Sequence, residues 1–71
     1  MSERYWSVNL ESTKEALAVT VALTKNSSWF EAEPLPDDKW SIKFHSDRGE
    51  TVRKALDEHT NRLVGLIMHN G

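Results

Sequence analysis

Apolar and polar residues alternate in the first element that the chain predicts. In Trp6-Ser7-Val8-Asn9-Leu10 every second residue is apolar, which is typical of a strand with one buried and one solvent-facing side. Ser12 and Glu15 follow with the spacing of a capping box, in which the serine hydroxyl accepts from the backbone amide of the glutamate. The sequence therefore predicts a strand over 6–10 and a helix that begins after Ser12.

Residues 16–24 carry two competing patterns. The larger apolar side chains alternate and include β-branched residues, which favours a strand: Leu17, Val19, Val21 and Leu23. The capping box before them favours a helix. We expect a helix that ends near Lys25-Asn26, where asparagine can take the left-handed cap conformation, and a strand is the alternative.

A short internal repeat supports the helix. Residues 6–12 align with residues 40–46 at an offset of 34 residues, and the tryptophan and both serines of the segment are identical in the two copies. Each copy has a strand pattern that leads into a serine able to cap a helix. The repeat predicts the same succession of strand, cap and helix in both halves of the chain.

Two more alternating segments, 29–33 and 39–44, flank a run of prolines and aspartates at 34–38 that is typical of a turn. They predict a hairpin. Placing Phe30 and Ala32 on the same face as Trp40 pairs position 32 with 40 and position 30 with 42. On the other face this register sets residues of complementary chemistry opposite each other, namely Glu33 with Lys39 and Trp29 with Lys43.

The C-terminal part of the chain has the periodicity of a helix. Either Ser46 or Asp47 can cap it, and Asp47 has capping-box spacing with Glu50. Apolar residues then recur at steps of three and four, which forms a stripe: Val52, Ala55, Leu56, Leu63, Leu66 and Ile67. The pattern predicts a helix that runs to about Asn70, with His59 inside the stripe at the edge of the core.

These elements predict one α+β domain over residues 1–71 with the order β-α-β-β-α. A right-handed crossover makes the first two strands parallel with a gap between them, and the hairpin places the third strand in that gap. The result is a three-stranded, antiparallel-type sheet in the order 1-3-2, with both helices on one face. This arrangement resembles the split βαβ, ferredoxin-like fold without its last strand.

Two surfaces of this predicted fold are free for a partner. The outer edge of the first strand is bare, and the segment 5–10 has neither a proline nor a charged residue that would discourage pairing with another strand. The face opposite the helices is also open. We predict partner-binding residues on or beside it: Tyr5, Ser7, Asn9, Trp29, Lys43 and His45.

The sequence contains little that indicates catalysis or a cofactor. Cysteine is absent, which excludes disulfides, thiolate metal sites and cysteine nucleophiles. His45, His59 and His69 have no metal-ligand spacing, and no nucleophile elbow or phosphate-binding glycine loop is present. We therefore expect no metal, no cofactor and no enzymatic activity.

The function that these features favour is a small, non-catalytic protein-interaction or regulatory module. Its partner would be another protein or a second copy, forming a homodimer, through the first strand or the open face. The alternative is a sheet that binds single-stranded nucleic acid, but Glu31 and Glu33 would repel phosphate and the net charge of −2 lacks a basic excess. Because the chain has no leader pattern and no run of roughly 18 apolar residues, we expect a cytoplasmic protein without a membrane span.

Overall fold

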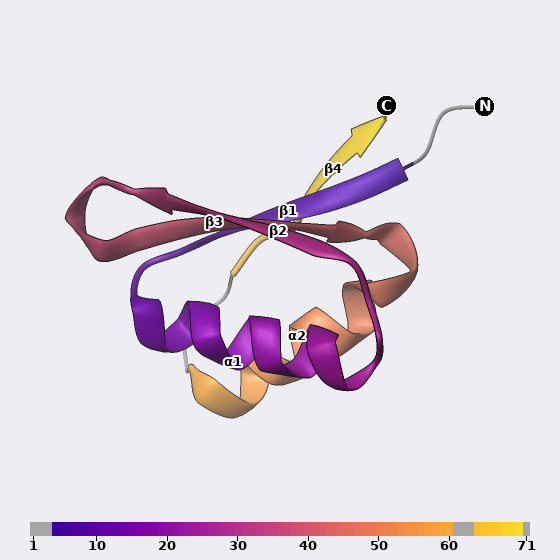
Figure 1. The fold of residues 1–71 in the computed structure, drawn as a ribbon, viewed down its shortest axis with the longest axis horizontal. Coiled ribbons are helices and arrows are strands. Elements are labelled where there is room, and N and C mark those ends of the chain that lie inside the picture. Colours follow the sequence, from indigo (N-terminus) through magenta and orange to yellow (C-terminus); the bar gives the residue numbers. More distant parts are fainter. Residues whose placement is uncertain (1–3, 61–63, 71) are drawn as a thin grey trace.

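The structure of the protein is a computed structural model, which describes residues 4–60 and 64–70. Within those ranges the chain forms a four-stranded antiparallel sheet in the order β2-β3-β1-β4, with two helices on one of its faces (Figure 1). The elements are β1 (Arg4–Leu10), α1 (Thr13–Lys25), β2 (Phe30–Leu35), β3 (Lys39–His45), α2 (Gly49–His59) and β4 (Ile67–Asn70). Two short 3-10 turns, η1 (Pro36–Asp38) and η2 (Ser46–Arg48), precede β3 and α2.

The α+β class and the two helices on one face are confirmed, but the expected three-stranded sheet is wrong. A fourth strand, β4, pairs antiparallel with β1 from Ser7 opposite Ile67 to Arg4 opposite Asn70. The order β-α-β-β-α-β, with β1 and β3 in the middle of the sheet, is the complete split βαβ arrangement. β4 therefore covers the edge of β1 that the sequence predicted to be bare.

The error arose from the predicted length of the second helix. α2 ends at His59, which is exposed, and Thr60 is already extended with φ −147° and ψ 148°. The predicted stripe continued through Leu63, which lies outside the described residues, to Ile67, which the structure places in β4. Gly65 disfavours a helix there by about 1 kcal/mol, and a strand supplies hydrogen-bond partners for the edge of β1.

The hairpin forms in a register two positions away from the predicted one. Phe30 pairs with Phe44 and Pro34 with Trp40, so β2 extends through the first proline and the turn is confined to Pro36–Asp38. β2 is an edge strand, where a proline without an amide hydrogen is tolerated. Since the shift is an even number of residues, the predicted faces are kept, but Glu31 rather than Trp29 lies opposite Lys43.

α1 is a helix, as expected, and Ser12 is its N-cap. The Ser12 hydroxyl accepts from the Glu15 amide at 3.2 Å, while the Glu15 carboxylate accepts from the amide of Glu11. At the other end Ser27, not the predicted Asn26, takes the left-handed conformation, with φ 53°. The Ser27 and Ser28 amides donate to the carbonyls of Thr24 and Leu23, which forms a Schellman cap.

The second capping prediction is wrong. The residues expected to cap, Ser46 and Asp47, lie in η2, and the Asp47 amide donates to Nδ1 of His45 at 3.1 Å. α2 begins only at Gly49, after Arg48, whose side chain makes no capping hydrogen bond. The strand, turn and helix of the repeat are thus present twice, but with two different local connections.

The core lies between the sheet and the helices. Its buried side chains come from every layer: Val8, Leu10, Ala16, Val19, Leu23, Ile42, Phe44, Val52, Leu56 and Val64. Trp6, Phe30 and Trp40 pack against it and are partly buried. Ala32 is exposed although it lies on the helix side, because α1 covers this part of the edge strand β2 incompletely and leaves a groove there.

Candidate interaction surfaces

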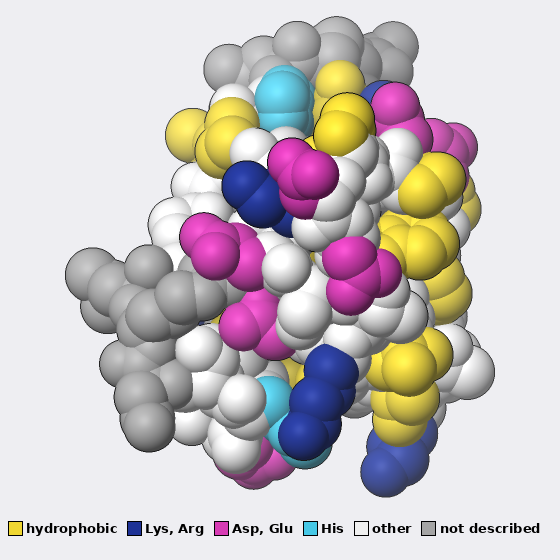
Figure 2. Space-filling model, turned by 90° about the vertical axis from the view of Figure 1, so that its left-hand side faces the viewer, with side chains coloured by type: hydrophobic (Ala, Val, Ile, Leu, Met, Phe, Trp, Pro, Cys, Tyr) yellow, Lys and Arg dark blue, Asp and Glu magenta, His cyan; other side chains and the backbone are white. Residues whose placement is uncertain are grey.

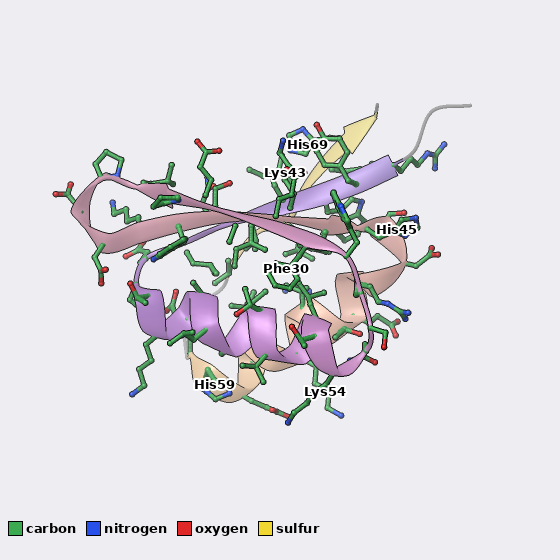
Figure 3. All side chains as sticks on the ribbon, viewed as in Figure 1. Phe30, Lys43, His45, Lys54, His59 and His69 are labelled. Atoms are coloured by element: carbon green, nitrogen blue, oxygen red, sulfur yellow. The ribbon has the colours of Figure 1, made fainter. Side chains whose placement is uncertain are left out.

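Four side chains form one cluster on the open face of the sheet. The rings of Tyr5 and His69 stack with their centroids 4.8 Å apart and an interplanar angle of 12°. His69 Nε2 lies 2.8 Å from Oγ of Ser7, and Lys43 Nζ lies 5.4 Å from the centroid of the Tyr5 ring. Figure 3 shows Lys43 and His69 on the side of the sheet away from the helices. The structure therefore brings together three predicted site residues and adds His69, which the sequence placed near the end of a helix.

Two neighbouring side chains of this cluster already contact the aromatic ring of Tyr5. His69 approaches the ring from β4 and Lys43 approaches it from β3, and these two strands flank β1. A base that stacked on Tyr5 would have to displace one of these neighbours. The cluster fastens β4 to β1, and it is a weak stacking platform for nucleic acid.

The other predicted site residues lie elsewhere. Trp29, which is 51% exposed, and His45 border a separate hollow of about 250 Å³ at the end of the hairpin near η2. Arg48 also borders it, and His45 Nδ1 lies 3.5 Å from the Asp47 carboxylate. Asn9 is exposed opposite Ser41, towards the turn end of the sheet. The six predicted residues are therefore divided among three places.

An apolar surface lies on α1 and was not among the predicted sites. Ala16, Val19 and Leu23 are buried, yet Leu17 and Val21 on another side of the same helix are 59% and 49% exposed. Figure 2 shows hydrophobic side chains gathered along the flank formed by α1 and the hairpin. The helix thus has two apolar faces, and only one of them faces the core.

A groove of about 190 Å³ runs beside Leu17, while Val21, one turn further along α1, borders a separate hollow between α1 and α2. The walls of the groove come from α1 and from the hairpin: Thr13, Ala16, Leu17, Thr20, Ala32 and Trp40. Trp40 is held in place because its Nε1–H donates to Oγ1 of Thr13 at 3.0 Å, while the Thr13 hydroxyl donates to Asp38 at 2.6 Å. We call Leu17, Val21 and this groove the α1 surface.

The sequence did contain a signal for this surface. The alternation that made residues 16–24 ambiguous arises because Val19 and Leu23 face the core while Leu17 and Val21 face outwards. A helix with one solvated side would carry polar residues at the outward positions. The strand-like alternation in residues 16–24 therefore arose from a second apolar face on the helix.

Other kinds of site have less support. Within residues 4–60 and 64–70, no three His, Cys, Asp or Glu side chains are grouped so as to hold a metal ion. Neither α1 nor α2 has the length and apolar character that crossing a bilayer requires.

No model of a known protein family matches the chain, and no curated protein matches its sequence.

Proposed function

We propose that the protein is a small protein-interaction module whose partner at the α1 surface is a second copy of the chain. The observation that carries the proposal is the half-exposure of Leu17 and Val21, together with the apolar groove beside Leu17. Contiguous apolar surface of this kind marks contact sites in soluble proteins. A helix with apolar residues on two sides is stabilised when both sides are covered.

The shape of the α1 surface favours a symmetric pair. In a two-fold dimer the same patch meets itself, so it must contain both a projection and a depression. Leu17 and Val21 project from α1, and the groove beside Leu17 is the depression. An antiparallel α1–α1 contact would place the ridge of each copy against the groove of the other.

The charges at the two ends of α1 favour the antiparallel direction. Around its N-terminal end, acidic residues outnumber the basic Lys14 and Lys39: Glu11, Glu15, Asp37 and Asp38. Around its C-terminal end the basic residues Lys25, Arg48 and Lys54 outnumber the acidic Asp47 and Glu58, and Arg48 Nη2 lies 3.5 Å from the Asn26 carbonyl. Antiparallel pairing brings the acidic end of one copy to the basic end of the other.

Sedimentation velocity across a concentration series tests this proposal. We expect a reversible dimer for the natural chain, and a monomer for Leu17→Glu and Val21→Glu because each buries a charge in the contact. Glu33→Lys is the control, since Glu33 is exposed on β2 two residues from Glu31, which pairs with Lys43 on the face of the sheet away from the helices (Figure 3). Circular dichroism would establish that each variant is folded.

Charge reversal tests the direction of pairing. Lys25→Glu and Glu11→Lys should each weaken the dimer severalfold, and the double variant should recover affinity because opposite charges again face each other. The proposal would be contradicted if the natural chain stays monomeric at high micromolar concentration. It would also be contradicted if Leu17→Glu leaves the dimer affinity unchanged.

Binding of single-stranded nucleic acid is the second candidate function. Its support is the hollow where the exposed Trp29 lies with Arg48 and His45, because aromatic and cationic side chains together bind bases and phosphates. A salt-dependent gel shift with oligonucleotides, abolished by Trp29→Ala, would favour this function. The acidic Asp47 in the same hollow and the net charge of −2 count against it.

A further inference from the structure

The two edges of the sheet differ in how they are protected. β2, at one edge, carries Glu31, Glu33 and Pro34, which discourage the addition of another strand. β4, at the other edge, has the sequence Ile-Met-His-Asn, with neither proline nor a formally charged acid or base. Ile67 and Met68 point to opposite faces of the sheet and are 46% and 58% exposed. Within residues 4–60 and 64–70 no strand pairs with the outer edge of β4, so this edge is open to pairing, with apolar side chains on both sides.

A hollow lies beside this edge on the helix side. It has a volume of about 390 Å³ and is bordered by Trp6, by Leu66 just before β4, by Ser46 and Asp47 of η2, and by Gly49, Glu50 and Arg53 of α2. Trp6 is the β1 residue that pairs with Met68. A strand added along β4 would have the side chains of its helix side directed towards this hollow, because successive side chains alternate between faces.

We infer that the β4 edge and the adjoining hollow form a strand-addition site for an extended segment of another protein. Main-chain hydrogen bonds to β4 supply affinity, and a pocket for alternate side chains supplies specificity. The occupant has a run of three apolar residues, of which the first and third face the hollow and the second packs against Ile67. This site is separate from the α1 surface and does not depend on dimerisation there.

The charges around β4 define the occupant further. Arg4 is exposed and lies opposite Asn70 in the β1–β4 pair. An acidic residue of the added segment, at the end that lies beside Asn70, would be attracted to the Arg4 guanidinium. The Arg4 side chain is long enough to extend past β4. The segment is therefore an apolar triplet with an acidic residue on one side of it.

A second copy of the chain does not fit this edge as well. Two-fold pairing of β4 with β4 would set one hollow against the other, so that two concave surfaces meet and both remain largely unfilled. The α1 surface differs in having a ridge as well as a groove. The β4 edge is thus better suited to a foreign strand, and the α1 surface is better suited to a second copy.

Peptide selection followed by NMR tests this inference. Random linear peptides displayed on phage would be selected on the full chain, and the consensus peptide titrated into nitrogen-15-labelled protein. We expect a consensus of three apolar residues next to an acidic one, and amide shifts centred on residues 67–70 with a shifted Trp6 indole signal. Met68→Lys and Ile67→Lys should each weaken binding at least about tenfold, because lysine on an edge opposes strand addition.

Matched variants make the result decisive. Glu33→Lys places a lysine on the opposite edge and should leave the affinity for the peptide unchanged. Arg53→Phe fills the hollow from α2 and should weaken binding severalfold without altering β4. The inference is overturned if no peptide is selected, if the amide shifts fall on α1 or around Trp29, or if Met68→Lys binds equally well. It is also overturned if Met68→Lys dissociates a dimer, since the edge would then belong to a second copy.

Discussion

Trp40 donates its indole Nε1–H to the Thr13 hydroxyl at 3.0 Å, which links the third strand to the first turn of α1. Thr13 donates its own hydroxyl proton to Asp38 in the hairpin turn, so one chain of hydrogen bonds joins helix, strand and turn. The same contact fixes the tryptophan ring as a wall of the groove. These two hydrogen bonds thus contribute both to stability and to the shape of the α1 surface.

The two partly buried tryptophans should respond differently to phenylalanine. Among the described residues Trp6 Nε1 is buried without a hydrogen-bond partner, whereas Trp40 Nε1 is bonded. Trp40→Phe should cost about 1 kcal/mol more in unfolding free energy than Trp6→Phe, because only the first change removes a hydrogen bond. Urea denaturation measures the difference. Equal losses for the two variants would show that the Thr13 contact contributes nothing.

Removing the His69 ring should loosen β4 selectively. His69→Ala deletes both the stack on Tyr5 and the hydrogen bond with Ser7, for an expected loss of about 1–2 kcal/mol. Hydrogen exchange of the amides at 67–70 should accelerate more than that of β3. His59→Ala is the matched control, because His59 is exposed at the end of α2 and should leave exchange in β4 unchanged.

Gly49 and Gly65 should differ in their tolerance of alanine. A Cβ at Gly49 would lie 2.8 Å from the Trp6 ring, while one at Gly65 would meet nothing within 4 Å. Gly49→Ala should lower the unfolding free energy by about 1–2 kcal/mol through overpacking, and Gly65→Ala should change it by less than about 0.5 kcal/mol. Thermal denaturation of the pair provides the comparison. A neutral Gly49→Ala would mean that the indole moves aside freely.

Glycine at position 27 should stabilise the protein. Ser27 occupies the left-handed position of the Schellman cap with φ 53°, a conformation that glycine adopts without the steric cost of a Cβ. Ser27→Gly should raise the unfolding free energy by about 0.5–1 kcal/mol. Ser27→Ala keeps the Cβ and should produce no such gain. A stabilising alanine variant would therefore refute the conformational explanation.

Local patterns were sufficient for most of the elements. Alternation in 6–10 and in 39–44 identified β1 and β3 and their faces, because a strand with one buried side must alternate. Ser12 indicated the start of α1, because its hydroxyl can accept a hydrogen bond from the backbone amide of Glu15. These features depend on neighbouring residues alone. For the same reason the grouping of Tyr5, Ser7 and Lys43 on one face was predictable.

The end of the chain and the arrangement of the surfaces were decided by tertiary structure. Ile67 suits a helical stripe as well as a strand, and pairing with β1 determines which of the two forms. That pairing brings His69 to Tyr5 from the far end of the sequence and moves the open edge from β1 to β4. Leu17 and Leu23 are equally apolar, and only packing determines which of them is buried. Sequence by itself determined the elements as far as α2 and their faces, whereas long-range contacts determined β4 and which surfaces remain for a partner.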